Sequence, residues 1–305
     1  MAKKSSRQLN NFELVEHFLQ NALSIELIEN GNYEIVPKIV STELNIENFD
    51  ESLISLNSKS YRVAEYRKDA DRKRLIDKII VELLVNKRIE NDEDIKLGNG
   101  GAFPLTEVQT SRDAYIVIGL PASGKSGIAN KIADEFGAMI LDSDYAKRKL
   151  PEFLALPFGA TLVHEESDRI IFGENNPKKI KSLFDYCAEL GMNIVLPRIG
   201  HNYESILDLI NTLKLKSYKV HLTLIELDRI KATQRALERY KSTERYVPLG
   251  LIFDTYGNNP TITFYKIITH NSQLLESYGI INTDVEFGKE PMSIMKNAKN
   301  PSNLY

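Results

Sequence analysis

The segment that decides the fold reads Tyr115-Ile116-Val117-Ile118-Gly119-Leu120-Pro121-Ala122-Ser123-Gly124-Lys125-Ser126. Its first four residues are all apolar, which is typical of a short strand buried on both faces of a sheet. The next eight match G-x-x-x-x-G-K-[ST] at every fixed position, and residues 128–136 have the apolar spacing of a helix. A buried strand, a glycine-containing loop and a helix in this order predict a loop that binds phosphate.

The residue types of this loop suit that chemistry. Glycines let backbone N–H groups turn inward around phosphate oxygens, and the start of the helix adds partial positive charge. Lys125 can reach the β- and γ-phosphates of a nucleotide, and Ser126 can place its hydroxyl on Mg²⁺. The alternative is a chance match on a tight turn between a strand and a helix. We expect ATP and Mg²⁺ to bind here, through Gly119, Ser123, Gly124, Lys125, Ser126 and Gly127.

After Ser111 the chain alternates apolar strands with helical segments. Strands without polar alternation, separated by helices, indicate a parallel sheet covered on both faces. The predicted fold class is therefore α/β, a P-loop kinase-like parallel sheet covered by helices on both faces, with an N-terminal, mainly helical extension. Further strands are expected at 138–141, 192–196 and 220–227, helices at 161–172, 177–190, 203–213 and 229–240, and either element at 261–268.

The first hundred residues have a different character, and we divide the chain into an accessory region (1–58), a helical segment with a linker (59–110) and a kinase domain (111–305). Tyr33-Glu34-Ile35-Val36-Pro37 suggests a short strand, and the polar, Gly-rich stretch 91–101 suggests a linker or loop.

A helix is expected over 66–88, because Ile76, Ile79, Ile80, Leu83 and Leu84 recur at i, i+3, i+4, i+7 and i+8. The surrounding segment is basic, with 10 Lys/Arg against 5 Asp/Glu between residues 59 and 88. We expect the apolar face to dock on the kinase domain through Ile76, Ile80 and Leu83, with a solvated basic back. A surface for nucleic acid or for a partner protein is the alternative.

Composition excludes several classes of protein. The 305 residues hold 39 Lys/Arg against 42 Asp/Glu, a net charge of −3, which is too balanced for a general nucleic-acid binder. The single cysteine, Cys187, excludes an intramolecular disulfide and a cysteine-cluster metal site. No apolar run approaches the roughly twenty residues needed to cross a bilayer. We expect a cytoplasmic protein without a membrane partner, and delivery into a target cell is compatible with this sequence.

The residues after two of the strands favour a small-molecule kinase over a motor or a switch. Pro197 follows one strand where many motor NTPases carry an acid, and proline cannot bind Mg²⁺. Asp142-Ser143-Asp144 follows another strand, at the sheet edge that faces ligands in such folds. We assign Asp144 to accept the proton of an acceptor hydroxyl and Asp142 to support it, beside Mg²⁺. Capping of the next helix is the structural alternative for both.

Cations and one further acid complete the candidate site. Arg235 and Arg239 share a face of the helix at 229–240, and Arg245 follows a polar turn; these arginines could neutralise the transferring phosphoryl group, or face solvent. Glu166 and Arg169 lie in a helical stretch and are candidates for contact with the acceptor, although Arg169 also suits an ordinary surface pair.

Taken together, these residues resemble the zeta toxin family of P-loop kinases over about 111–257. The segments that carry the resemblance are Gly119 to Ser126, the stretch Asp142-Ser143-Asp144-Tyr145-Ala146-Lys147-Arg148-Lys149-Leu150-Pro151-Glu152-Phe153, residues 192–202, and Leu237-Glu238-Arg239-Tyr240 with Glu244-Arg245-Tyr246-Val247-Pro248. The resemblance implies that Asp144 is the base for a ribose or sugar hydroxyl and that Arg239 and Arg245 act on ATP phosphates from a lid.

Family members phosphorylate a UDP-amino sugar or a ribose hydroxyl of NAD-type nucleotides, which implies a nucleotide-like or sugar-nucleotide acceptor, a toxic role, and an antitoxin or inhibitor protein as partner. The chain departs from the UDP-sugar kinases in one segment. They carry Glu-Gly-Thr-Gly-Arg after the third strand, where this chain has Pro197-Arg198-Ile199-Gly200-His201. Arg198 and His201 suit a more anionic acceptor, or simply form the turn. A polynucleotide or RNA kinase and a nucleotide-binding interaction module are the alternative functions, although a nucleic-acid partner is not favoured.

Overall fold

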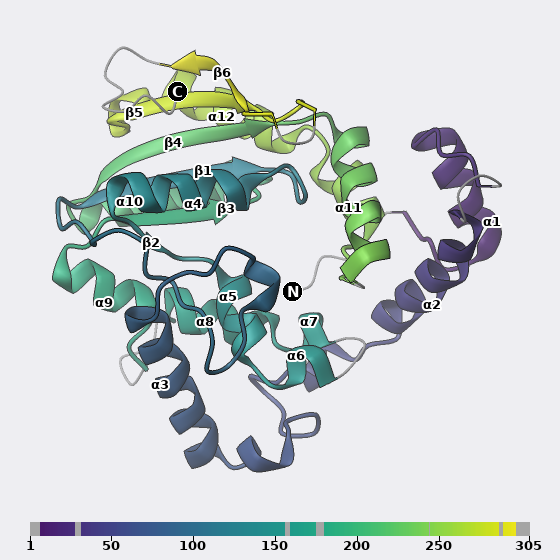
Figure 1. Ribbon diagram of the computed structural model, residues 1–305, viewed down its shortest axis with the longest axis horizontal. Helices are drawn as coiled ribbons and strands as arrows, with labels where there is room; N and C mark the ends of the chain where they lie inside the picture. Colours follow the sequence, from purple (N-terminus) through teal and green to yellow (C-terminus); the bar gives the residue numbers. More distant parts are fainter. Residues whose placement is uncertain are drawn as a thin grey trace.

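The computed structural model describes residues 7–27, 32–155, 159–174, 180–243, 245–286 and 289–296. One six-stranded sheet forms the centre, across the upper half of Figure 1. Its strands are β1 (Asp113–Gly119), β2 (Met139–Ile140), β3 (Ile194–Arg198), β4 (Lys219–Glu226), β5 (Ser277–Asn282) and β6 (Met292–Lys296). They lie in the order β2-β3-β1-β4-β5-β6, and all pairs are parallel except β5 with β6 at the edge.

Helices cover both faces of this sheet. Helix α4 (Lys125–Phe136) packs on β1, β2 and β3, whereas α10 (Tyr203–Leu215) and α12 (Asn259–His270) pack on β4 and against each other. Right-handed crossovers explain why α4 lies on one face and α10 and α12 on the other. The chain crosses the sheet in one direction through α4, from β1 to β2, and in the opposite direction through α10 and α12, from β3 to β4 and from β4 to β5. The predicted α/β class is confirmed. The strand order reverses at β1, and ligands of such sheets bind beyond the carboxyl ends of the strands at that point.

The middle of the sheet is fully buried, which explains why its strands carry no polar alternation. Ile116 of β1 lies in register between Leu196 of β3 and Leu222 of β4. None of these three side chains exposes measurable surface. Burial of each stabilises the fold by roughly 1.5–3 kcal/mol relative to an exposed side chain. The strand that precedes the phosphate loop is therefore held on both sides.

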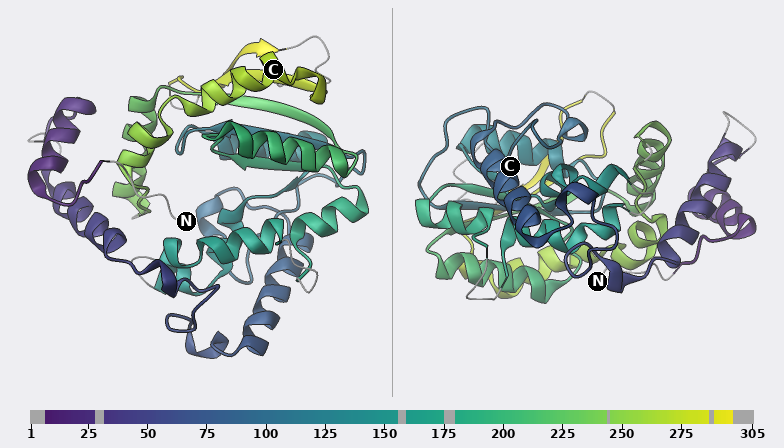
Figure 2. Two further views of the ribbon diagram at one scale, coloured as in Figure 1. Left: turned by 180° about the vertical axis from the view of Figure 1, so that it is seen from behind. Right: turned by 90° about the horizontal axis from the view of Figure 1, so that it is seen from below.

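The N-terminal region packs on the helix that follows β4. It comprises α1 (Phe12–His17), a π-helical turn (Phe18–Ala22) and α2 (Ile35–Glu47). Their apolar side chains form a second core with α11 (Arg229–Thr243) and with a further π-helical turn at Leu251–Tyr256. Figures 1 and 2 show α1 and α2 on the outer side of α11.

The predicted strand at 33–37 is wrong, since these residues lie in a 3₁₀ turn and the start of α2. One face of α2 is buried and consists of Ile35, Val36, Ile39 and Val40. Their i, i+1, i+4, i+5 spacing is helical, but it extends beyond residues 33–37, from which the strand was predicted. Pro37 is tolerated in the first turn of a helix, where its missing N–H has no partner to lose.

The predicted docking helix is confirmed as α3 (Asp69–Val85). Ile79 and Leu83 are completely buried, and Ile76 and Ile80 are 9% and 3% exposed. They belong to the same core as the sheet. Figure 1 shows α3 below the sheet, where it contacts three helices: α5 (Ser143–Lys149), α8 (His164–Phe172) and α9 (Leu183–Leu190).

The stretch 91–101, for which a linker or a loop was predicted, is a folded loop packed on α5. Its first part forms a 3₁₀ turn at Asp92–Asp94, and Ile95 is 3% exposed. The ammonium group of Lys149 donates to the carbonyl oxygens of Lys96 and Asn99 at 3.0 and 3.1 Å. A polar, Gly-rich sequence can be ordered in this way because a buried donor satisfies its backbone carbonyls.

Several element boundaries differ from the prediction. The helix expected at 161–172 is divided into α7 (Gly159–Leu162) and α8, and a short α6 (Glu152–Ala155) precedes them. Helix α9 begins only at Leu183, after a capping box at Ser182, and residues 177–179 lie outside the described residues. Residues 261–268 are helical, within α12, and β5 and β6 were not predicted. No helix of the described residues combines the length and the apolar character needed to span a bilayer.

Candidate functional site

The conformation of the loop between β1 and α4 depends on two glycines and on a contact with the segment after β5. Gly124 caps the helix with a φ of +88°, in the left-handed region that favours glycine. A Cβ atom at Gly119 would lie 2.8 Å from the carbonyl oxygen of Ile225 and 3.0 Å from Ser123 Oγ. The hydroxyl of Thr283 donates to the carbonyl oxygen of Ser123 at 2.8 Å. Glycine is therefore required at both positions, and the loop is tied to the segment after β5.

Lys125 begins α4, with its ammonium group turned back over the loop. Its Nζ donates to the carbonyl oxygen of Leu120 at 2.5 Å. Burial lowers the pKa of this ammonium to about 8, an effect that Asp142 opposes and Arg239 reinforces. The next residue, Ser126, is exposed. A cation and a hydroxyl are thus presented at the start of the helix, as a phosphate loop requires.

The two acids after β2 lie at the start of α5. Asp142 caps the helix by accepting the backbone N–H of Asp144 at 2.9 Å, so the capping alternative and a role in the site hold together. Burial and the neighbouring Asp144 raise the pKa of Asp142 to about 6. Burial also opposes ionisation of Asp144, but Lys147 and Arg245 outweigh it and hold the pKa of that carboxyl far below its usual range. One acid of the pair is therefore firmly ionised.

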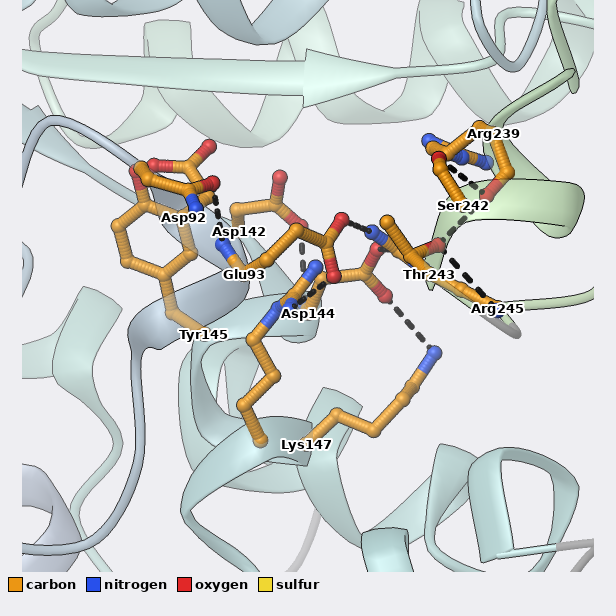
Figure 3. Close-up of polar contacts among 12 residues, drawn as sticks. Asp92, Glu93, Asp142, Asp144, Tyr145, Lys147, Arg239, Ser242, Thr243 and Arg245 are labelled. Atoms are coloured by element: carbon orange, nitrogen blue, oxygen red, sulfur yellow. Dashed lines mark hydrogen bonds and ion pairs between the residues drawn. The ribbon is translucent and has the colours of Figure 1, made fainter.

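Arg245, in the segment after α11, reaches this acid pair, and Arg239 of α11 lies farther from it (Figure 3). Arg245 forms an ion pair with Asp144 through Nη2 and donates through Nη1 to Glu93 Oε1 at 2.9 Å. Arg239 is different, because its buried Nε has no hydrogen-bond partner within the part of the chain that the structure describes. Burial lowers the pKa of Arg239, and the adjacent Arg245 lowers it further. A buried Nε donor without a partner on a cationic side chain is suited to meet an anion.

Five predicted residues meet in this cluster, and their charges act on one another's pKa. Three cations surround the mouth of the phosphate loop, which fits the charge of ATP phosphates. The hydroxyl of Ser126 and the carboxylate of Asp142 are the hard oxygen donors that Mg²⁺ prefers. The described residues contain no group of three or more His, Cys, Asp or Glu side chains able to hold a metal ion. Ser126 and Asp142 would therefore share Mg²⁺ with phosphate oxygens of the nucleotide. The five predicted residues that meet in the cluster are Lys125, Asp142, Asp144, Arg239 and Arg245.

Arg198 lies on the other side of the acid pair, at the end of β3. Its guanidinium carbon is 3.8 Å from the ring centroid of Phe172, and its Nη1 is 3.7 Å from Asp168 Oδ1. Asp168 also accepts the hydroxyl of Ser143, the residue between the two acids, at 2.7 Å. Arg198 is thus a cation next to the acid pair, as a contact with the acceptor would require.

Two predicted residues lie around the cluster. Arg235 donates to the carbonyl oxygen of Thr283 at 2.9 Å, on the side of the phosphate loop. His201 packs against Tyr256 in a tilted arrangement, with ring centroids 5.0 Å apart and the rings inclined by 47°. This contact connects the turn after β3 to the π-helical turn that packs on the N-terminal region.

Glu166 and Arg169, both predicted as contacts of the acceptor, pair outside the cluster described above. Glu166 is 1% exposed, and its two oxygens accept Nε and Nη2 of Arg72 at 2.7 and 2.6 Å. Arg72 also pairs with Glu152 at 2.8 Å, so this buried group joins α3 to α6 and α8. Arg169 pairs with Glu174 at 2.5 Å, in agreement with a surface role. The carboxylate of Glu166 is used in packing because α3, distant in sequence, brings Arg72 to it.

The structure adds residues that the sequence did not single out. Arg148 of α5 donates through Nη1 to Glu93 Oε2 at 2.6 Å, so that Glu93 joins it to Arg245. Lys147 donates to Asp144 Oδ1 at 2.9 Å. Lys147 and Arg148 stand in the segment that carried the family resemblance, but Glu93 gave no signal beyond an acidic run in a polar loop.

Comparisons with known proteins agree with this geometry. The zeta toxin family model matches residues 103–264, more than half of the chain. A search of curated proteins gave no significant match. A solved structure of the PezAT chromosomal toxin–antitoxin system of Streptococcus pneumoniae is similar, with a TM-score of 0.51, 17% identity, and coverage of 77% of this chain and 84% of that chain. A structure of the AvrRxo1-ORF1:-ORF2 complex aligns with a TM-score of 0.48 and 18% identity over 77% of this chain and 68% of that chain.

The resemblance inferred from the four sequence segments is confirmed by the match to the family model. The fold agrees, since a mostly parallel sheet flanked by helices is also that of P-loop kinase-like proteins. The chain belongs to the zeta toxin family.

Proposed function

We propose that this protein is an ATP-dependent kinase that phosphorylates a ribose or sugar hydroxyl of a nucleotide or nucleotide sugar, and that it acts as a toxin or effector. Membership of the zeta toxin family supports a phosphotransferase of the kinase type. The single observation that carries the proposal is the cluster at the carboxyl edge of the sheet. There an ionised carboxylate, Asp144, pairs with Arg245, and the charges of both act on the phosphate-loop Lys125.

The proposed chemistry assigns one task to each group. Asp144 accepts the proton of the acceptor hydroxyl while the acceptor oxygen bonds to the γ-phosphorus and the bond from that phosphorus to the β–γ bridging oxygen breaks, which leaves ADP. Lys125, Arg239 and Arg245 neutralise charge on the phosphoryl oxygens. Mg²⁺, held by Ser126 and Asp142, would screen the β- and γ-phosphates. Catalysis of this kind depends on position and charge rather than on a covalent intermediate with the protein.

The proposed acceptor is an anionic metabolite that contains a nucleotide. Arg198 provides a guanidinium beside the acid pair, within 3.8 Å of the Phe172 ring. A guanidinium with an aromatic neighbour suits a phosphate or carboxylate attached to a planar group. The UDP-sugar kinases of the family have another sequence in this segment, which supports an acceptor other than theirs.

A partner protein that restrains the activity is also proposed. The similar Streptococcus pneumoniae structure belongs to a toxin–antitoxin system. A toxic kinase in the cytoplasm needs such restraint in the cell that makes it, and co-purification from that cell tests for the partner.

The test is incubation of the purified protein with labelled ATP, Mg²⁺ and an extract of small metabolites, followed by mass spectrometry. We expect a product heavier by one phosphate, and none with Lys125→Ala. That variant should remain folded, because a surface loop contributes little to the core. Transfer by Lys125→Ala at the parental rate, or label appearing only in added RNA or DNA, would overturn the proposal.

A further inference from the structure

The loop that carries Glu93 is built onto the helix that carries the proposed base. Tyr145 donates its hydroxyl to Asp92 Oδ1 at 2.9 Å. Lys149, whose side chain is completely buried, holds two carbonyl groups of the same loop and pairs with Glu82 at 2.8 Å. Tyr145 and Lys149 of α5 thus hold the loop by hydrogen bonds. Asp144 and Lys147 of the same helix pair with each other, and Asp144 also pairs with Arg245. The 3₁₀ turn is therefore fixed relative to Asp144.

Glu93 stands in this fixed turn and accepts hydrogen bonds from two arginines, one of which, Arg245, is labelled in Figure 3. Its Oε2 accepts from Arg148 at 2.6 Å and its Oε1 from Arg245 at 2.9 Å. The Arg148 side chain is 4% exposed and that of Arg245 is 23% exposed, so this is no ordinary surface pair. Burial opposes ionisation, but the two arginines lower the pKa of Glu93 to about 2. The carboxylate is a permanent negative charge at neutral pH.

Arg245 uses different nitrogens for its two carboxylates. Nη1 donates to Glu93, and Nη2 pairs with Asp144. A planar guanidinium can keep one contact while the other nitrogen changes partner. Asp144 cannot take a proton from an acceptor efficiently while Nη2 holds it, because the cation stabilises the ionised form.

We propose that Glu93 is a positioning residue for the reaction, and that it anchors Arg245 through Nη1 while Nη2 exchanges Asp144 for a phosphoryl oxygen. This inference rests on the proposed function. The exchange releases the base at the moment the phosphate group is in place. It also makes the loop at 91–101, outside the segment matched by the family model, an integral part of the site.

The test compares Glu93→Gln with Glu93→Asp and with Asp94→Asn. Asp94 is the exposed neighbour in the same turn, so its variant removes an equal charge without touching Arg245. We expect Glu93→Gln to lower kcat about tenfold and to weaken ATP binding, since Arg245 then rests on Asp144 alone. Glu93→Asp should recover part of the loss, and Asp94→Asn should match the parent.

A second background separates positioning from a merely structural effect. If Glu93 acts through Arg245, the Glu93→Gln change should cause no further loss in Arg245→Gln protein. An equal loss in both backgrounds would overturn the proposal, as would parental activity or tighter ATP binding in Glu93→Gln. Failure of the proposed function has a different signature: the parent protein itself does not transfer phosphate or does not bind ATP, which overturns both ideas together. Thermal melting of each variant checks the fold.

Discussion

Arg245 forms an ion pair with Asp144, across about a hundred residues of sequence. The proposed phosphate clamp and the proposed base thus hold each other in an ion pair. The pair lowers the pKa of Asp144 and raises that of Arg245. Phosphate oxygens must draw Arg245 away before the carboxylate can serve as a base. ATP binding and activation of the acceptor are therefore expected to be coupled.

The first prediction separates the two members of this pair. Asp144→Asn should slow the single-turnover step by at least about 10²-fold, the lower range for a general base, and should leave ATP affinity equal or tighter because Arg245 is released. Arg245→Ala should instead weaken ATP binding as well as turnover. Nucleotide affinity and single-turnover rates in both variants provide the check. An Asp144→Asn protein that loses ATP binding yet transfers normally at saturation would show that Asp144 is a phosphate or metal ligand.

The second prediction concerns pH. The pKa of Lys125 is lowered from 10.5 to about 8, chiefly by burial, so its charge is lost as pH rises through about 8. ATP affinity should fall over this range, approaching tenfold for each further pH unit. Lys125→Arg is the matched control, since a guanidinium stays charged and its weaker binding should be flat with pH. Parallel profiles for the two proteins would contradict the assignment. Equilibrium titration with a fluorescent ATP analogue at pH 7–9.5 measures both.

The third prediction tests the docking of α3. Ile80 is 3% exposed and its neighbour Val81 is 55% exposed. Ile80→Asp places an unpaired charge in the main core and should lower the free energy of unfolding by about 3–5 kcal/mol. Val81→Asp adds the same group to the solvent side and should cost under about 1 kcal/mol. Urea denaturation gives both values, and equal midpoints would mean that α3 is not docked through this face.

The fourth prediction concerns the contact between the N-terminal region and the segment that follows α11. Glu43 of α2 is 9% exposed and accepts the hydroxyl of Tyr246, and burial raises the pKa of this carboxyl. A raised pKa in the folded state gives stability that is complete below the ordinary value of 4.5 and is lost as pH rises through the folded-state value. Glu43→Gln keeps an acceptor without the charge, so its Tm at pH 7.5 should exceed that of the parent by a few degrees, the scale of about 1 kcal/mol.

The gain from Glu43→Gln should shrink as pH falls toward 4, because the parent carboxyl is then protonated. Glu13→Gln, at an exposed position of α1, is the control and should change Tm little at either pH. A Glu43→Gln protein less stable than the parent at pH 7.5 would mean that the charge itself strengthens the bond to Tyr246.

The sequence predicted the parts that depend on near neighbours. Strand, loop and helix around Lys125 follow from apolar runs and from glycine at two positions, and the apolar face of α3 follows from helical spacing. Edge strands were missed where the pattern is weak, since Gly279 interrupts the short apolar run of β5 and β6 lies on the margin of the sheet. At 33–37 a five-residue window favoured a strand, whereas the buried face of the whole helix decides the conformation.

Motif and spacing by themselves determined the family, the phosphate loop and the identity of the acid pair and the arginines, because these depend on residues a few positions apart. Only the tertiary structure decided that Glu93, 152 residues from Arg245, belongs to the site, and that Glu166 instead pairs with Arg72 in the interior. Glu93 and Glu166 are the same amino acid in two different environments. Whether a carboxylate is a buried structural ion or part of a site depends on which cation the fold brings within about 3 Å, and that distance is set by packing between segments that no local pattern connects.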